Sequence, residues 1–188
     1  MIEIVPYQAS WPSDFQQIAS ILRQGLGDSA KRIDHIGSTS VPGLAAKDVI
    51  DIQVTVAALD PALLSAMLAL GYSQPPGIWR DHRPARAEGP ESEWEKCFFD
   101  PPPGQRRTNT HVRIQGRANQ SYALLFRDYL RLHPATAEAY AELKRRLADN
   151  LADPRMYSDV KDPAVDLIYL AAQDWTERIP WEPGPSDA

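Results

Sequence analysis

Two segments of the chain alternate hydrophobic and polar residues with a period of two, the pattern of a strand with one buried face. They are residues 49–56 and 108–115. The polar positions are Asp51, Gln53 and Thr55 in the first segment and Asn109, His111 and Arg113 in the second. Each segment therefore predicts a strand that packs on one face and presents polar side chains on the other.

Helical spacing dominates most of the remaining chain. A helix is predicted from Ser10 to about Leu26, and a second follows the Asp60-Pro61 cap. Three more are predicted near residues 120–132, from Pro134 to about 151, and from Asp162-Pro163 onward.

Shorter strands are predicted at residues 31–36 and 94–100, with a loop at residues 73–92. The Pro/Gly/Ser-rich tail after Pro180 is expected to be frayed. These elements make an α+β protein in which about 115 mixed residues precede a helical part. We divide it at 1–116 and 117–188, and we expect both parts to pack as one compact unit.

Composition narrows the function only slightly. The 188 residues are 43% hydrophobic and carry a formal net charge of -5, which argues against a general nucleic-acid binder. No apolar run approaches the roughly 20 residues of a membrane helix, and the first residues lack a signal pattern. With Cys97 as the single cysteine and no intramolecular disulfide possible, we expect a cytoplasmic protein.

A tight turn at Gly37-Ser38 precedes the strand that carries Asp51. Glycine lets the backbone approach a phosphate, serine adds a hydroxyl donor, and a short helix after the turn would favour an anion. This layout is typical of enzymes that hold a triphosphate and a metal. The alternative is that Asp51 and Gln53 belong to a solvated strand face.

The residue that shares the face of Asp51, two positions on, is an amide. Carboxylates at both positions could grip Mg²⁺, but Gln53 offers only a neutral oxygen. We therefore predict weak Mg²⁺ binding at Asp51, completed by ligand phosphates. Another acid, Glu93, Glu95 or Asp100, would join it if the strand at 94–100 lies alongside.

Three further residues are candidates for the same site. His111 could bind metal or act as a base, and Arg113 could clamp a phosphate. Lys47 precedes the Asp51 strand and could reach a phosphate, or it could simply be solvated. We predict that Gly37, Ser38, Asp51, Gln53, His111 and Arg113 converge on one cavity. His82 and His133 are interpreted as surface residues.

Several segments together resemble the GrpB-like family. They are HIGSTSVPGLAAK at 35–47, Ile50-Asp-Ile52, LFRDYL at 125–130 with His133-Pro134, Tyr140 with Lys144, and Tyr157 with Lys161. The resemblance implies a nucleotidyltransferase-like mixed β-sheet core with flanking helices and a helical C-terminal part. It implies no particular reaction, and similar modules occur fused behind dephospho-CoA kinase domains.

The chain departs from the family pattern at two positions. Arg113 stands where a second histidine of a His-x-His pair is expected, and Asp48 follows Lys47 where proline is usual. Arg127 and Lys161 match family segments on helices with apolar faces. Either they form salt bridges, for example Arg127 with Asp166, or they reach across to the anion at Gly37-Ser38 so that the helices form a lid.

Three functions remain open on the sequence. The first is nucleotidyl transfer with Mg²⁺ to an unknown acceptor, using Asp51 and His111. The second is a catalytically degenerate module that binds a nucleotide or anion. The third is an accessory module that docks on a protein partner.

Overall fold

A computed structural model describes residues 2–84 and 87–188 of the chain. Its centre is a four-stranded sheet in the order β1-β2-β4-β3. The strands are β1 (Ala30–Ile36), β2 (Ile50–Val56), β3 (Cys97–Phe99) and β4 (Thr108–Ile114). β1 pairs antiparallel with β2 and β3 antiparallel with β4, whereas the central strands β2 and β4 are parallel. The sheet is therefore mixed, as the sequence predicts.

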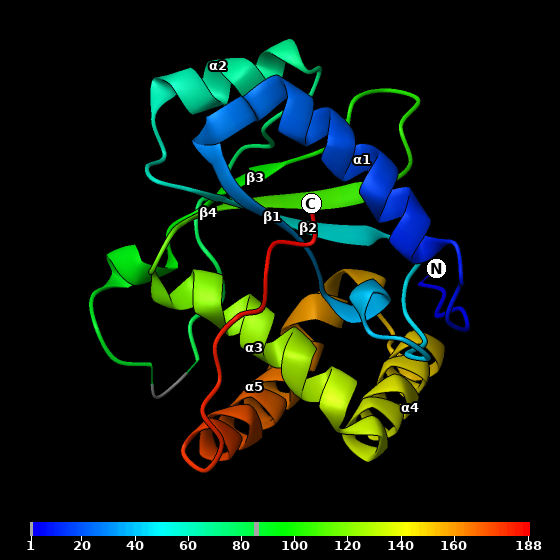
Figure 1. Cartoon of the computed structure of the whole chain (residues 1–188). Helices are drawn as coiled ribbons and strands as arrows, with labels where there is room; N and C mark the ends of the chain where they lie inside the picture. The colour runs from blue at the N-terminus through cyan, green and yellow to red at the C-terminus, as the bar shows by residue number, and fades with distance from the viewer. Residues whose placement is uncertain (1, 85–86) are drawn as a thin grey trace.

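Helices cover both faces of this sheet (Figure 1). The helices α1 (Trp11–Leu26) and α2 (Pro61–Ala69) lie on one face. The other face carries α3 (Ala118–Leu132), α4 (Pro134–Asn150) and α5 (Tyr157–Thr176). Short 3₁₀ helices occur at Gly27–Ser29, Ser38–Ser40, Glu91–Trp94 and Pro154–Met156. The mixed core with flanking helices agrees with the predicted fold class; the division at residue 116 stays a prediction.

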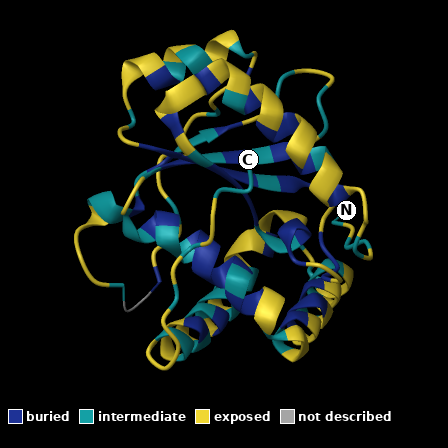
Figure 2. Ribbon diagram, in the orientation of Figure 1, coloured by how far each residue is buried: buried dark blue, intermediate teal, exposed yellow. Residues whose placement is uncertain are grey.

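The main hydrophobic core lies between the sheet and α1 and α2. Trp11, Phe15, Ile18 and Leu22 form the buried stripe of α1 at helical spacing. They pack in one cluster with the aliphatic residues of β2, and the sheet in Figure 2 is dark blue with some teal segments. The apolar face of β2 is buried by this packing. The intervening polar residues of β2 therefore point to the opposite face of the sheet, toward α3, α4 and α5.

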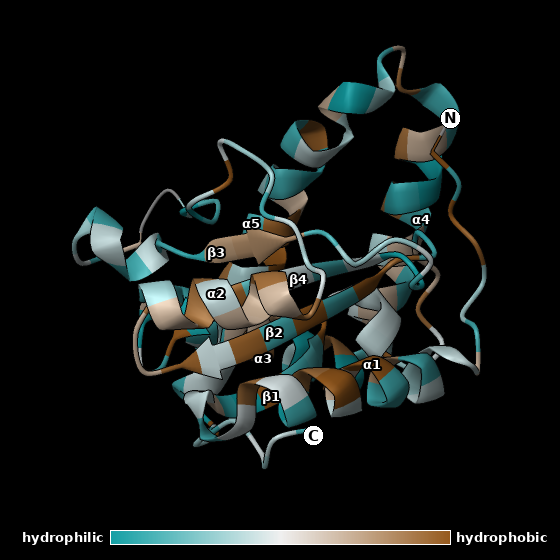
Figure 3. Cartoon of the chain, turned by 90° about the horizontal axis from the view of Figure 1, so that it is seen from above, coloured by the Kyte–Doolittle hydropathy of each residue, from teal (hydrophilic) through white to brown (hydrophobic). Residues whose placement is uncertain are grey.

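The register of the two central strands aligns their polar residues. Asp51 lies opposite Asn109 and Gln53 opposite His111, while Ile52 lies opposite Thr110. Brown and teal segments alternate along β2 in the view from above (Figure 3). Since paired residues share a face of a sheet, Asp51 and His111 point to the same side, as predicted.

Two predicted elements differ in extent. The predicted strand 94–100 is reduced to Cys97–Phe99, because residues 91–94 turn as a 3₁₀ helix before it. The last helix begins at Tyr157 rather than at Asp162, and Pro163 lies inside it. The start signal is Asp153, whose side chain accepts from the Arg155 amide and opens a 3₁₀ turn that leads into α5.

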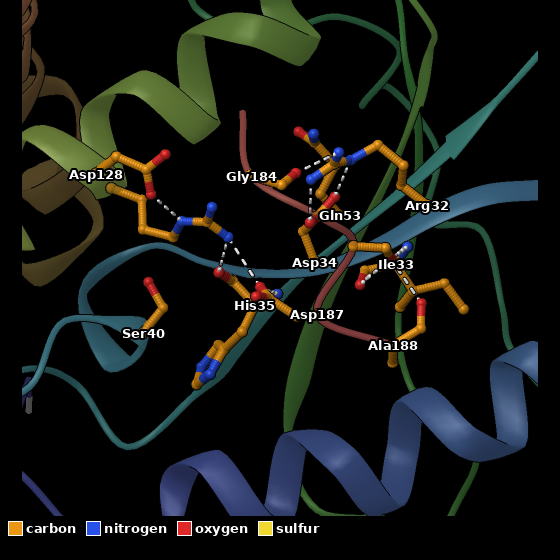
Figure 4. A network of polar contacts seen from close by, with 12 residues as sticks. Arg32, Ile33, Asp34, His35, Ser40, Gln53, Asp128, Gly184, Asp187 and Ala188 are labelled. Atoms are coloured by element: carbon orange, nitrogen blue, oxygen red, sulfur yellow. Dashed lines mark hydrogen bonds and ion pairs between the residues drawn. The ribbon is translucent and has the colours of Figure 1, made fainter. Parts of the chain in front are cut away.

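The C-terminal tail is docked rather than frayed. Asp187 Oδ2 accepts from the His35 amide at 2.9 Å, Ser186 Oγ accepts from the Ile33 amide at 2.9 Å, and the Ala188 amide donates to the Ile33 carbonyl at 3.1 Å. Arg32 also donates to the carbonyl of Gly184 (Figure 4). The prediction of a frayed tail considered composition only and is wrong, because the free backbone groups of β1 provide partners for it.

In the part of the chain that the structure describes, no helix combines the length and the apolar character needed to cross a bilayer.

Candidate functional site

A cavity of about 390 Å³ lies between the polar face of the central strands and α3, α4 and α5. Seven of the nine residues predicted for a site line it: Gly37, Ser38, Lys47, Asp51, His111, Arg113 and Lys161. The loop predicted at 73–92 contributes Asp81 and His82. The cavity therefore joins the turn after β1, the central strands and the C-terminal helices.

Gly37 is required by its contact with Asp51. Its φ of 67° and ψ of -170° belong to a region that other residues avoid. A Cβ at this position would lie 2.3 Å from Asp51 Oδ2. The helix expected after the turn is only the three-residue 3₁₀ helix at Ser38–Ser40. The turn therefore places Gly37 against the Asp51 side chain, with Ser38 in the cavity lining, and provides no long helix that points at an anion.

Asp51 occupies the floor of the cavity. It is half-buried, and Asn109 Nδ2 donates to its Oδ1 at 2.8 Å. Burial raises the pKa of the Asp51 carboxyl despite this hydrogen bond and the nearby lysines. The carboxylate is thus expensive to desolvate, and positive charges around it offset that cost.

Lys144 on α4 lies deepest among the lysines of the cavity. Its ammonium donates to Ser38 Oγ at 2.9 Å and to the Ala45 carbonyl at 2.5 Å, and the residue is only 3% exposed. Burial, followed by the charge of Lys161, lowers the pKa of Lys144 to about 7. Sequence reasoning noted this lysine only as part of the family pattern and gave it no role in a site.

A repeated spacing could have identified the helical wall. Tyr140 and Lys144 on α4, and Tyr157 and Lys161 on α5, are each four residues apart, and all four line the cavity. Residues at this spacing share one face of a helix. Burial alone would lower the pKa of Lys161, but attraction to Tyr140, Asp162 and Asp51 raises it.

A second charged cluster lies further along the floor, around Asp81. Its carboxylate accepts from Arg113 at 2.7 and 2.8 Å, from Lys96 Nζ at 2.7 Å and from Asn119 Nδ2 at 2.9 Å. Burial would raise the pKa of Asp81, but Arg113 and Lys96 hold it well below its usual range. Neither Asp81 nor Lys96 was predicted, since no periodicity marks either of them.

His111 is neutral in this cluster. Burial and the charges of Lys96 and Arg113 lower its pKa well below the usual value. Its Nδ1 lies 3.0 Å from Lys96 Nζ, and an ammonium can only donate. The ring proton of the neutral imidazole is therefore on Nε2. This tautomer can donate a hydrogen bond to a ligand, whereas the nitrogen needed by a general base is already occupied.

Two predicted site residues lie outside the cavity. Gln53 is fully buried beneath it, where its Oε1 accepts from Arg113 Nη1 at 2.6 Å and its Nε2 donates to the Gln120 carbonyl. It positions Arg113 instead of facing a ligand. The Gln53 side chain lies on the predicted face of the sheet, but the Arg113 guanidinium lies between it and the cavity.

Arg127 does not reach the anion side either. It is 3% exposed and donates to Asp128, to Asp187 and to the His35 carbonyl. Asp128, Asp187 and His35 can be followed in Figure 4. The salt-bridge interpretation of Arg127 is confirmed, but its acids are Asp128 and Asp187, whereas Asp166 contacts His82 Nε2 at 3.0 Å. Arg127 therefore anchors the tail.

The donor set of the cavity fits a protein-bound divalent cation poorly. Within the described ranges, no group of three histidine, cysteine, aspartate or glutamate residues is arranged to hold a metal ion. Glu93 and Glu95 bind the Ala118 amide and Arg117, so neither supplies the second acid considered above. Asp51 is thus a single carboxylate with Lys47, Lys144 and Lys161 around it.

Titration of Mg²⁺ into the ligand-free protein is expected to give almost no binding heat. Asp51 offers one charge, Gln53 is covered, and Mg²⁺ prefers several hard oxygen ligands. Isothermal titration calorimetry measures this directly, with Asp51→Asn as the matched control. A micromolar Kd that is lost in Asp51→Asn would contradict the expectation.

Comparison with known proteins relates this geometry to a family. The chain matches the family described as GrpB protein over residues 1–170. It is 37% identical to a protein of Mycobacterium tuberculosis named dephospho-CoA kinase, over 96% of this chain and 48% of that protein. It is 39% identical to the UPF0157 protein PA4798 of Pseudomonas aeruginosa, over 89% of this chain and 66% of that protein. The chain thus spans about half the length of the curated relatives named as kinases.

Solved structures show the same fold. The crystal structure of the conserved protein GrpB from Enterococcus faecalis superposes with a TM-score of 0.74 at 28% identity, over 92% of this chain and 99% of that one. The GLD-2/RNP-8 complex matches with a TM-score of 0.55 at 11% identity, over 96% of this chain and 56% of that one. The structure of Cid1 in complex with its short product ApU matches with a TM-score of 0.51 at 15% identity, over 77% of this chain and 43% of that one. Likeness at such low identity concerns the fold alone.

Proposed function

The chain belongs to the GrpB family and has the fold of nucleotidyltransferases, and from that premise we propose that it binds a nucleotide or a similar phosphate-bearing small molecule in the cavity. The observation that carries the proposal is the excess of cations over acids around one cavity. A ligand with phosphate groups would neutralise that excess through charge-assisted hydrogen bonds.

The excess can be counted from the lining. The cations are Lys47, Lys96, Lys144, Lys161 and Arg113, and the acids are Asp51, Asp81 and Asp162. Five cations against three acids leave two positive charges when all are ionised. The whole chain has a net charge of -5, so this local surplus runs against the global balance. Such a surplus in a low-dielectric cavity favours an anion.

Nucleotidyl transfer with Mg²⁺ is the second candidate. Asp51 on the cavity floor favours it, because a nucleotide could bring phosphate oxygens that complete the metal shell. His111 would then donate a hydrogen bond from Nε2 and would not act as the base. The acceptor is unassigned. A kinase activity is named only for relatives of which this chain covers 48%, so it is not carried over.

A thermal-shift screen tests the main proposal. Nucleoside triphosphates, each with and without Mg²⁺, are expected to raise the melting temperature. A ligand at a hundred times its Kd adds about 2.7 kcal/mol to the free energy of unfolding. Nucleosides without phosphates are the matched control and should give no shift. If no phosphate-bearing ligand stabilises the protein, the proposal fails.

Lys161→Ala is expected to weaken binding of the ligand found in that screen about tenfold while changing the melting temperature little. Lys161 lines the cavity and is more than 4.0 Å from every described carboxylate oxygen, so few native contacts are lost. Removing a charge-assisted hydrogen bond to phosphate accounts for the loss in affinity. Affinity and melting temperature are measured side by side, with the exposed Lys31→Ala as control.

The opposite result would make Lys161 structural. If the substitution lowers the melting temperature and leaves affinity unchanged, the helices do not form a lid over the ligand.

A further inference from the structure

Three lysines approach the cavity from different segments around Ser38. Lys144 donates to Ser38 Oγ, Lys161 lies on α5, and Lys47 precedes β2 with its ammonium 4.8 Å from the ring centre of Tyr157. All three line the cavity. The charge of Lys161 contributes to the lowered pKa of both Lys47 and Lys144, after burial. The three ammonium groups are thus close enough to repel one another.

These charges lack matching acids. Asp51 and Asp162 are the acids nearest to Lys161, yet among the residues that the structure describes no carboxylate oxygen lies within 4.0 Å of any of the three amines. The hydrogen-bond partners of Lys144 are both neutral, a hydroxyl and a carbonyl. A buried ammonium with only neutral partners is costly, and an anion beside it would lower that cost.

The same charges oppose a divalent cation. Mg²⁺ needs several hard oxygen ligands at short range, and the single carboxylate Asp51 is surrounded by these amines. Phosphate oxygens have the opposite requirement, because ammonium groups and a hydroxyl are suitable donors for them. The arrangement therefore favours a phosphate ligand without bound metal over the same ligand as its Mg²⁺ complex.

Resting on the proposed function, we propose that Lys47, Lys144 and Lys161 take the place of a divalent cation and hold the terminal phosphates of a diphosphate or triphosphate ligand in metal-free form. Ser38 Oγ donates to the same phosphate group once Lys144 turns from it to the ligand. The ligand class is a polyphosphate ester or free polyphosphate, with no requirement for Mg²⁺ in binding.

Calorimetry with inorganic tripolyphosphate tests this on the unaltered protein. Titrations in EDTA and in excess Mg²⁺ are compared, with ATP as a second ligand. The Kd in EDTA is expected to equal or fall below the Kd in Mg²⁺, since bound Mg²⁺ removes two negative charges from the ligand. Binding that occurs only with Mg²⁺ would overturn the inference and leave the proposed function standing. If neither ligand binds in either condition, the inference is overturned, and the thermal-shift screen of the other phosphate-bearing ligands decides the proposed function.

Lys144→Met provides the variant. Methionine keeps most of the length of the lysine side chain but carries no charge, and the affinity for tripolyphosphate in EDTA is expected to fall about tenfold or more. Lys31→Met, on the exposed side of β1, is the matched control. An unchanged Kd in a folded Lys144→Met protein would overturn the inference. If that variant does not fold, the comparison of Kd values in EDTA and in Mg²⁺ on the unaltered protein still tests the inference.

Proton uptake gives an independent readout. Lys144 faces Lys161 from α5, Asp51 from β2 and Lys47, with Arg145 next to it on α4, and its pKa in the free protein is about 7. A phosphate group beside it would raise that pKa, so binding at pH 8 is expected to take up protons. Heats measured in buffers with different ionisation enthalpies report this uptake. Heats that show no uptake would contradict contact between Lys144 and the phosphate.

Discussion

Asp81→Ala is expected to lower the free energy of unfolding by about 3–5 kcal/mol, the range for removing one partner of a buried ion pair. Asp81 is the only carboxylate that contacts Arg113 and Lys96 within the described part of the chain, and both cations are almost fully buried. The substitution leaves two uncompensated positive charges in the cavity floor. Urea unfolding monitored by circular dichroism measures the loss as a lower midpoint at unchanged slope.

Asp153→Ala is the matched control. Asp153 pairs with Arg155 at the surface, where an ion pair contributes little to stability. In acid the difference in stability between the two variants should shrink, because protonation of Asp81 weakens its ion pairs in the Asp153→Ala protein. Because the pKa of Asp81 is lowered on folding, its stabilisation is present above the ordinary value of 3.8 and is lost as the pH falls below it. An Asp81→Ala protein as stable as the Asp153→Ala protein at pH 7 would show that the floor does not depend on this carboxylate.

Gly37→Ala is expected to cost about 3 kcal/mol, from an unfavourable backbone conformation together with a steric clash. The φ of 67° disfavours any side chain, and the added Cβ would lie 2.3 Å from Asp51 Oδ2. Gly43→Ala is the matched control, because Gly43 has a φ of 79° but nothing within 4 Å of the added atom. Its expected cost is only the backbone contribution of about 1–2 kcal/mol.

A double-mutant cycle separates the two contributions. In an Asp51→Gly background the Oδ2, Cγ and Cβ atoms that the added methyl group would meet are all gone, so Gly37→Ala should cost less than it does in the unaltered protein. Thermal or urea unfolding of the four proteins gives the coupling energy. Additive effects at positions 37 and 51 would mean that the turn relaxes away from Asp51 and that the contact does not fix its position.

The strand patterns predicted the floor of the cavity because strands encode their faces locally. The alternation in β2 and β4 placed Asp51 and His111 on one side, and the parallel register brought them side by side. Period alone could not show which polar residues on that side stay accessible. Gln53 and Arg113 share the predicted face, yet the guanidinium lies over the amide and hides it.

The helical wall and the loop were less predictable for physical reasons. Lys144 sits on a helix of mixed polarity, and its burial depends on how α4 packs against the turn at Ser38. Asp81 lies in a segment rich in proline and arginine whose position is set by its ion pairs with Arg113 and Lys96. Long-range packing decides the burial of both residues: the four-residue spacing from Tyr140 marks only the helix face on which Lys144 lies, and no pattern marks Asp81. Arg127 is the opposite case. A family segment suggested it as a ligand-binding residue, but the structure pairs it with Asp187 of the tail.

The docked tail also covers one edge of the sheet. β1 is an edge strand of the sheet, and the unpaired amides and carbonyls of an edge strand can pair with a strand of another molecule. Residues 184–188 occupy those groups at Ile33 and His35, and Arg127 secures them through Asp187. Residues 184–188 therefore protect this edge of the sheet from pairing with a strand of another molecule, which lowers the risk of aggregation.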